Sequence, residues 1–249
     1  MDDYRKVADL MRETGYVVAF TGSGISVDSG IPTFRGGQGL WEKYDPMEYA
    51  HIDAFRRNPE KVWNMLREMA DVIFAAKPSA AHVALGELET KGLLKAVITQ
   101  NVDGLHQVAG NTNVIEYHGN HRRLACLGCS GKMEFTQAEA RILPYPLCDR
   151  CFAPLKPDVV FFGEAIPMLE MVRANEEAQK CKVMLIIGTS GAVYPAADLP
   201  YLAHSSGAKV VEINLDPTPF TSSVADFFFQ GGASEVLPRI LEHLRTDCV

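Results

Sequence analysis

Long apolar runs are missing from this sequence. No stretch of its 249 residues approaches the roughly 18 consecutive apolar residues that suggest a membrane-spanning helix. The first residues, Met1 to Arg5, also lack the basic start and the apolar segment of a secretory signal peptide. We therefore expect a cytosolic protein with no membrane partner.

Positive charge is scarce as well. The chain has 24 Lys and Arg against 31 Asp and Glu, which gives a formal net charge of −7. This balance argues against direct binding of nucleic acid, because phosphate binding depends on Lys and Arg. It suits a cationic substrate such as a lysine-bearing tail, although an acidic balance is also ordinary for a soluble protein. No feature of the sequence fixes the oligomeric state.

Cysteine is infrequent, but four of the six cysteines form two close pairs. Cys126 and Cys129 make one C-x-x-C motif, and Cys148 and Cys151 make another. In a reducing compartment this spacing predicts a zinc ribbon rather than disulfides. Four thiolates complete a tetrahedral site and leave no position for water, so the zinc would be structural. The alternative is two unrelated pairs, one of them redox-active.

Apolar runs of strand length alternate along the chain with stretches of helical periodicity. The expected strands cover 16–20, 96–98, 114–115, 156–162, 182–187, 209–213 and 226–229, and the expected helices cover 3–14, 59–75, 79–91, 166–180 and 234–245. Such alternation predicts an α/β fold with a doubly wound parallel sheet, whose polar strand ends meet at one ligand-binding edge. In the cysteine-bearing segment, Pro144, Pro146 and Pro154 argue against regular elements.

The first expected strand runs into a loop of small residues, 21–26, with the sequence TGSGIS. Backbone N–H groups can approach phosphate only where side chains are absent, so this loop is typical of a pyrophosphate cradle. Its spacing departs from the dehydrogenase fingerprint, because Val27 occupies the third glycine position. The following segment, 31–49, predicts a long mobile loop over a nucleotide with Phe34 and Arg35 as contacts; the alternative is an ordinary solvent loop.

Polar side chains follow two expected strands in the middle of the chain. Gln100, Asn101 and Asp103 follow one apolar run, and His118 follows the next. At the carboxyl edge of a parallel sheet these side chains would point into one crevice. His118, at a strand end with a glycine behind it, is the candidate general base; the alternative is a histidine satisfied by core hydrogen bonds.

Taken together, these motifs resemble the sirtuin family, the NAD-dependent protein lysine deacylases. The segments that carry the resemblance are Gly22-x-Gly24-Ile25-Ser26, Gly30–Pro32 with Phe34-Arg35, Thr99–His106, His118-Gly119, the four cysteines, Val159-Val160-x-Phe162-Gly163-Glu164, Gly188–Ser190 and Asn214-x-Asp216. The family implies a Rossmann-like NAD-binding domain of residues 1–35, 81–119 and 158–249. It also implies a small domain formed by a helical insertion, 36–80, and the zinc-ribbon insertion, 120–157.

The resemblance implies an enzyme that consumes NAD to remove acetyl groups from lysine side chains of a protein or peptide. Nicotinamide and O-acetyl-ADP-ribose would be released. The implied catalytic residues are His118, Asn101 and Asp103. The implied NAD contacts are Gly22, Ser23, Gly24, Val27, Thr33, Phe34, Arg35, Gln100, Asn101, Val102, Asp103, His118, Gly188, Thr189, Ser190, Asn214, Leu215, Asp216 and Ala233. The implied peptide contacts are Val160, Phe162, Gly163, Glu164 and Val193.

One departure from the family pattern bears on the acyl group. Thr33 replaces the acid that commonly precedes Phe-Arg, as in the branch that removes acidic acyl groups. The Tyr and Arg with which that branch grips the acyl carboxylate align here with Leu66 and Met69. Because an unpaired buried carboxylate is costly, we expect acetyl or a longer uncharged acyl group.

Other classes remain open beside the deacetylase. A deacylase for other acyl groups or a mono-ADP-ribosyltransferase would use the same cofactor residues. A nicotinamide oxidoreductase is disfavoured by the broken glycine fingerprint. A zinc-ribbon nucleic-acid binder would need a basic face.

Overall fold

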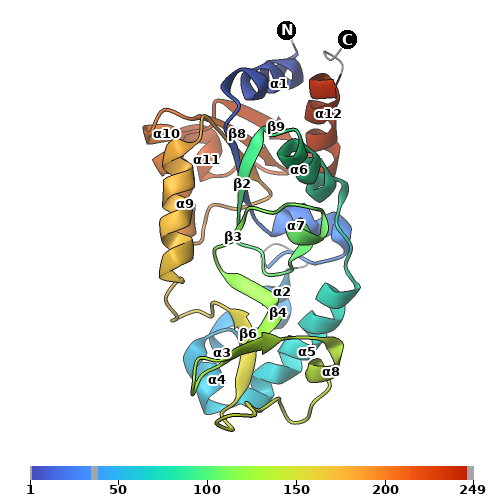
Figure 1. Cartoon of the computed structure of the whole chain (residues 1–249), viewed down its shortest axis with the longest axis vertical. Helices are drawn as coiled ribbons and strands as arrows, with labels where there is room; N and C mark the ends of the chain where they lie inside the picture. Colours follow the sequence, from blue (N-terminus) through green and yellow to red (C-terminus); the bar gives the residue numbers. More distant parts are fainter. Residues whose placement is uncertain (1, 35–38, 246–249) are drawn as a thin grey trace.

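A six-stranded parallel sheet lies at the centre of the larger part of the molecule (Figure 1). The computed structural model describes residues 2–34 and 39–245. The strand order is β3-β2-β1-β7-β8-β9, and each neighbouring pair runs parallel. The strands are β1 (Val17–Thr21), β2 (Leu94–Thr99), β3 (Val114–Glu116), β7 (Val183–Ile187), β8 (Lys209–Asn214) and β9 (Phe227–Gln230). The order reverses between β1 and β7, which confirms the predicted doubly wound sheet.

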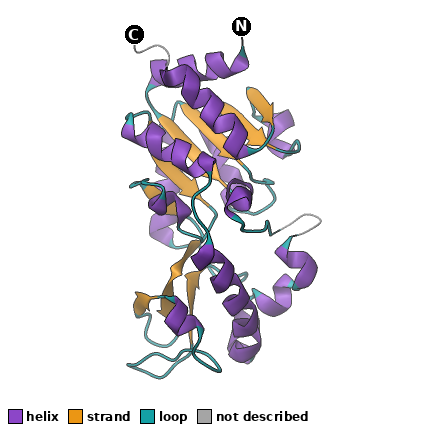
Figure 2. Cartoon of the chain, turned by 90° about the vertical axis from the view of Figure 1, so that its right-hand side faces the viewer, coloured by secondary structure: helices purple, strands orange, loops and turns teal. Residues whose placement is uncertain are grey.

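Helices cover both faces of this sheet (Figure 2). Val17 and Ala19 pack into the core on one face, together with α1 (Asp3–Thr14), α6 (Ala80–Thr90) and α12 (Ala233–Arg245). Val18 and Phe20 pack into the opposite core, together with α9 (Met168–Lys180), α10 (Leu199–Ser205) and α11 (Pro219–Ser223). In the described part of the chain, no helix has both the length and the apolar character needed to cross a bilayer.

A second, antiparallel sheet lies below the first in the view of Figure 1. Its order is β5-β4-β6, from β4 (Gly119–Cys126), β5 (Lys132–Glu134) and β6 (Leu155–Val159). The helices around it are α2 (Leu40–Lys43), α3 (Pro46–Tyr49), α4 (Ile52–Arg57), α5 (Pro59–Ala75) and α8 (Gln137–Ala140). They share a separate hydrophobic core, in which the indole N–H of Trp63 donates to the Leu155 carbonyl at 2.9 Å. The smaller part of the molecule is therefore stabilised by a core of its own.

Three predictions about this region were wrong. The expected strand at 156–162 does not join the parallel sheet, because it overlaps β6, which ends at Val159 and pairs with β4 in the small sheet. The cysteine-bearing segment contains regular elements despite its prolines. Pro157 even lies within β6, which is tolerated because β6 is an edge strand. The segment 31–49, expected to be a loop throughout, contains α2 and α3.

Candidate functional site

A cavity of about 760 Å³ lies at the carboxyl edge of the parallel sheet. Its walls come from the loops after β1, β2, β7 and β8, from residues 159–166 and from α5. The predicted site residues that line it are Gly22, Ser23, Gly24, Val27, Thr33, Phe34, Gln100, Asn101, Val102, His118, Val160, Phe162, Gly163, Glu164, Gly188, Thr189, Ser190, Val193, Asn214, Leu215, Asp216 and Ala233. Segments far apart in the sequence thus converge on one cavity.

Two predicted residues are not part of this wall. Asp103 lines an adjoining cavity of about 200 Å³, which shares Ser23, Phe34 and Asn101 with the larger one. Arg35 lies outside the described residues. The carboxylate of Asp103 is therefore displaced from the single crevice that the sequence predicted.

The loops after β1 and β7 touch backbone to backbone. The amide of Gly24 donates to the Gly188 carbonyl at 2.9 Å, and the amide of Gly22 donates to the Ile187 carbonyl at 3.0 Å. A Cβ atom on Gly24 would lie 2.6 Å from the Cα of Gly188, which is closer than side chains are found. Gly24 is therefore required where the short helix η1 (Ser23–Ser29) begins against the β7 loop.

Asn101, Ser26 and Asp103 form a buried chain of hydrogen bonds beside this contact. The amide Nδ2 of Asn101 donates to the Gly22 carbonyl at 3.0 Å and to the Ser26 hydroxyl at 3.2 Å. That hydroxyl donates to one carboxylate oxygen of Asp103 at 2.8 Å, while the Leu105 amide donates to the other at 2.9 Å. Both carboxylate oxygens are engaged within the protein, so Asp103 orients Ser26 and the loop before α7 (Leu105–Val108).

His118 lies between the two sheets, with its ring in the cavity wall. Its Nδ1 is 3.2 Å from the Gln100 carbonyl, which can only accept, so Nδ1 carries the proton and Nε2 holds the free lone pair. Burial lowers the pKa of His118 below its ordinary value of 6.5, although the hydrogen bond to Gln100 opposes the shift. The imidazole is neutral at pH 7 and can accept a proton at Nε2.

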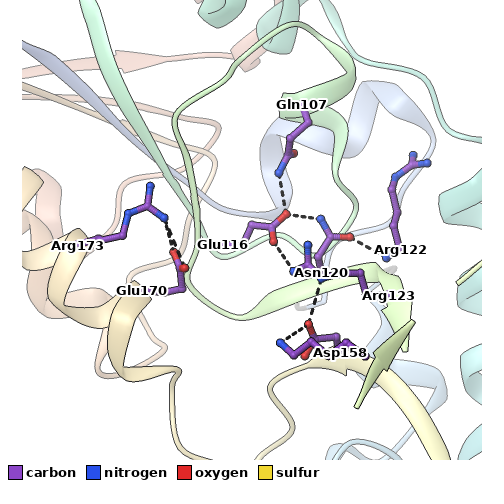
Figure 3. Close-up of polar contacts among 9 residues, drawn as sticks. Gln107, Glu116, Asn120, Arg122, Arg123, Asp158, Glu170 and Arg173 are labelled. Carbon is purple, nitrogen blue, oxygen red and sulfur yellow. Dashed lines mark hydrogen bonds and ion pairs between the residues drawn. The ribbon is translucent and has the colours of Figure 1, made fainter. Parts of the chain in front are cut away.

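A polar network supports the chain on either side of His118 (Figure 3). The guanidinium of Arg123 contacts Glu116 at 2.6 Å and Asp158 at 3.1 Å, and thereby joins β3, β4 and β6. Glu116 also accepts from the side chains of Gln107, at 2.7 Å, and Asn120. The position of His118 is thus fixed from both sheets.

The segment after β6 is held by a buried ammonium group. The Nζ of Lys156 lies 3.0 Å from the carboxylate of Glu164 and 2.6 Å from the Val159 carbonyl. The same carboxylate accepts from the Phe161 amide at 2.9 Å. On its other side, Phe162 exchanges backbone hydrogen bonds with the chain at 50–52. Residues 160–162 are therefore held along the cavity, and the chain turns directly after them, where the Glu164 amide donates to the Phe161 carbonyl at 3.0 Å and Gly163 has a φ of +84°.

The four paired cysteines meet at the end of the small sheet. Their Sγ atoms all lie within 4.8 Å of one another, with Cys126 to Cys151 at 3.4 Å and Cys129 to Cys148 at 3.7 Å. Tetrahedral zinc with bonds of about 2.3 Å places its sulfur ligands about 3.8 Å apart, so the cluster fits a structural zinc ion. Backbone N–H groups of Arg150 and Cys151 lower the pKa of Cys148 to about 6, which favours the thiolate that a metal needs.

Three residues of the site were not predicted from the sequence. Ser26 lies in the loop that the sequence predicts to bind phosphate, and its place in that loop is the feature that could have marked it as a site residue. Lys156 and His121 are buried, at 4% and 0% exposure, and neither motif nor spacing marked them. Their roles depend on burial, which one sequence does not reveal.

The comparisons with known proteins agree with this geometry. The Sir2 family model matches residues 22–195. An NAD-dependent protein deacylase of Pyrococcus furiosus is 49% identical over 245 residues, which cover 96% of this chain and 97% of that protein.

Solved structures are similar over almost the whole length. A mutant Sir2 homologue in complex with ADP-ribose has a TM-score of 0.94 and 43% identity, covering 99% of this chain and 97% of that one. A complex of Sir2, p53 peptide and NAD+ has a TM-score of 0.87 and 38% identity, covering 97% and 98%. The match of the family model to residues 22–195 and the 49% identity to the Pyrococcus furiosus deacylase show that the chain belongs to the Sir2 family, which confirms its resemblance to the sirtuins.

Proposed function

We propose that this chain is an NAD-dependent protein lysine deacetylase that releases nicotinamide and O-acetyl-ADP-ribose. One observation carries the proposal: a neutral imidazole, His118, faces the same cavity as the glycine loops after β1 and β7. The relatives named above act as deacylases or bind ADP-ribose, NAD+ and peptide, and this chain spans nearly all of their length.

NAD would lie along the carboxyl edge of the sheet. The loops at Gly22–Gly24 and Gly188–Ser190 carry small residues, so a pyrophosphate could approach their backbone closely; the amides of Gly22, Gly24 and Gly188 are already bonded to backbone carbonyls, which leaves the other N–H groups of these loops to donate. Asn214, Leu215, Asp216 and Ala233 line the same cavity around β8 and the start of α12 and would contact the adenosine half. The nicotinamide half would then lie toward Ser23, Phe34, Gln100 and Asn101.

The acylated peptide would bind along residues 160–164 and Val193. An extended peptide adds backbone hydrogen bonds and needs little sequence specificity, as in other strand additions. The net charge of −7 suits a lysine-bearing partner. The amide of Val160 donates to the His118 carbonyl at 2.9 Å, so the peptide segment and the imidazole are linked through the backbone.

The reaction would begin when the acyl oxygen bonds to the ribose carbon that carries nicotinamide, as the bond to nicotinamide breaks. The amide of Asn101 stands beside this part of the cavity and would stabilise the developing charge. Asp103 would act through Ser26, since both of its carboxylate oxygens are already engaged. Nε2 of His118 would take a proton from a ribose hydroxyl, whose oxygen then attacks the acyl carbon. Water would then add at that carbon while its bond to the lysine nitrogen breaks, which gives free lysine and O-acetyl-ADP-ribose.

The test is a product analysis by mass spectrometry with NAD and acetyl-, propionyl-, succinyl- and myristoyl-lysine peptides. We expect O-acyl-ADP-ribose and free lysine from the uncharged acyl groups, and at least a 100-fold loss of rate in His118→Ala, the size of a general-base contribution. The matched control is His204→Ala, an exposed histidine on α10. Nicotinamide release that does not depend on acyl-lysine would instead indicate a glycohydrolase or ADP-ribosyltransferase.

The four close thiols favour a reducing compartment, where they bind metal rather than pair as disulfides. We therefore propose the cytosol as the location.

A further inference from the structure

His121 is buried in the cavity wall with no hydrogen-bond partner among the described residues. The residue is 0% exposed, and neither ring nitrogen has a hydrogen-bond partner on another described residue, although an interaction with its own backbone partly opposes the burial shift of its pKa. A neutral imidazole always carries one N–H donor and one acceptor, and buried groups of this kind are normally paired. The unpaired ring therefore requires an explanation.

Packing alone does not explain this histidine. Its ring lies 5.1 Å from the ring of Phe135 and 6.3 Å from that of Phe74, measured between ring centres. An apolar side chain of similar size would pack against the same aromatic rings without leaving polar atoms unpaired. The chain thus carries a hydrogen-bonding group where hydrophobic packing favours an apolar one.

The position of His121 connects it with the reacting end of the cavity. Its backbone amide donates to the Val102 carbonyl at 2.7 Å, next to Asn101. It follows His118 by three residues, so their Cα atoms are at most about 10 Å apart along extended chain. Met65, Leu66 and Met69 of α5 line the cavity as well, and they are apolar. This part of the wall therefore offers one polar group in an apolar surrounding.

We propose that His121 hydrogen-bonds a hydroxyl group on the acyl chain of the substrate, and that the enzyme prefers hydroxyacyl-lysine to the plain acyl-lysine of equal length. The inference rests on the proposed deacylase function. A hydroxyl both donates and accepts, which matches the two nitrogens of a neutral imidazole. A carboxylate matches less well, because burial lowers the pKa of His121 to about 4 and the neutral imidazole offers it no positive charge at pH 7.

The experiment compares hydroxybutyryl-lysine and butyryl-lysine peptides, with the hydroxyl on carbon 3 or carbon 4. In the wild type we expect a higher kcat/KM for a hydroxybutyryl peptide. His121→Phe should lower the ratio of the two kcat/KM values about three- to tenfold, the size of one neutral hydrogen bond. His121→Gln, which keeps a donor and an acceptor, should recover part of the ratio. His204→Phe is the matched control: it makes the same substitution at an exposed histidine on α10, so the ratio should stay at the wild-type value.

A ratio that is the same in wild type, His121→Phe and His121→Gln would overturn the inference and leave a purely structural histidine. Faster turnover of succinyl-lysine than of hydroxybutyryl-lysine would also overturn it. If the wild type releases no nicotinamide with any acyl peptide, the proposed function itself fails, and the two failures are thereby distinguished. Because His121→Phe removes unpaired polar atoms, thermal unfolding should show a folded variant at least as stable as the wild type at pH 7.

Discussion

The buried ammonium of Lys156 allows a direct test of how the peptide segment is held. Its side chain is 5% exposed, and its partner Glu164 is 22% exposed. The Nζ atom also lies 4.6 Å from the centre of the Phe161 ring. Replacing Lys156 with Met keeps most of the apolar stem and removes the charge, so the change isolates the ion pair.

The expected loss of stability follows from the burial of the pair. Removing one partner of a fully buried pair costs about 3–5 kcal/mol, because the other charge is left uncompensated. Glu164 keeps some contact with water, so we expect Lys156→Met to lower the free energy of unfolding by about 2–3 kcal/mol. Adding Glu164→Gln should restore about 1 kcal/mol, since the amide still accepts from Phe161 without a charge.

Denaturant unfolding followed by fluorescence of Trp63, which is buried in the small core, measures these changes. Lys61→Met is the matched control: it breaks an exposed pair with Glu48 and should lower the free energy of unfolding much less than Lys156→Met does. The KM for acyl peptide should rise more than the KM for NAD. Strictly additive effects of Lys156→Met and Glu164→Gln, or a loss no larger than that of the control, would refute the reasoning.

Three further predictions concern the cofactor loops, acid stability and the metal. Gly24→Ala forces a Cβ against Gly188 and should raise the KM for NAD about tenfold in steady-state assays; an unchanged value contradicts the close contact. Burial lowers the pKa of His121 to about 4 in the folded protein, whereas the unfolded chain keeps the ordinary value of 6.5. As the pH falls below 6.5, the unfolded chain therefore binds the proton before the folded protein does. Stability is thus lost toward low pH, and His121→Phe should reduce the loss between pH 7 and pH 5 by about 2 kcal/mol in urea titrations. Cys148→Ser should release zinc, measured by metal analysis, and lower Tm by about 10 °C; a metal-free variant with unchanged Tm excludes the structural role.

The parallel sheet could be predicted because its strands are buried on both faces. Strands β1 and β7 are buried at every position and therefore read as unbroken apolar runs. The rule that ligands bind at the carboxyl ends of such strands then located the cavity. Cysteine spacing located the metal cluster, since it reflects ligand geometry directly.

The small sheet was missed because its strands lack that signature. Strand β5 is exposed at each of its positions, and β6 contains Pro157 at an edge, where no inner hydrogen bond is lost. Lys156 and His121 were missed for a related reason. A charged or polar residue is usually exposed, and only the packed structure reveals that these two are buried.

The connection between the two sheets at His118 also limits which changes in chain length the protein can tolerate. Strand β3 ends at Glu116 and β4 begins at Gly119, so only Tyr117 and His118 lie between them. The Tyr117 amide is tied to the Thr99 carbonyl at 3.0 Å, and Gly119 has a φ of +80° with the Asp158 carbonyl close behind its Cα. A single inserted residue would shift the imidazole out of register with one sheet or the other, whereas an insertion elsewhere on the surface would lengthen a loop. Variants of this sequence can therefore gain or lose residues at many turns, but the two-residue spacing at 117–118 between β3 and β4 has to stay unchanged.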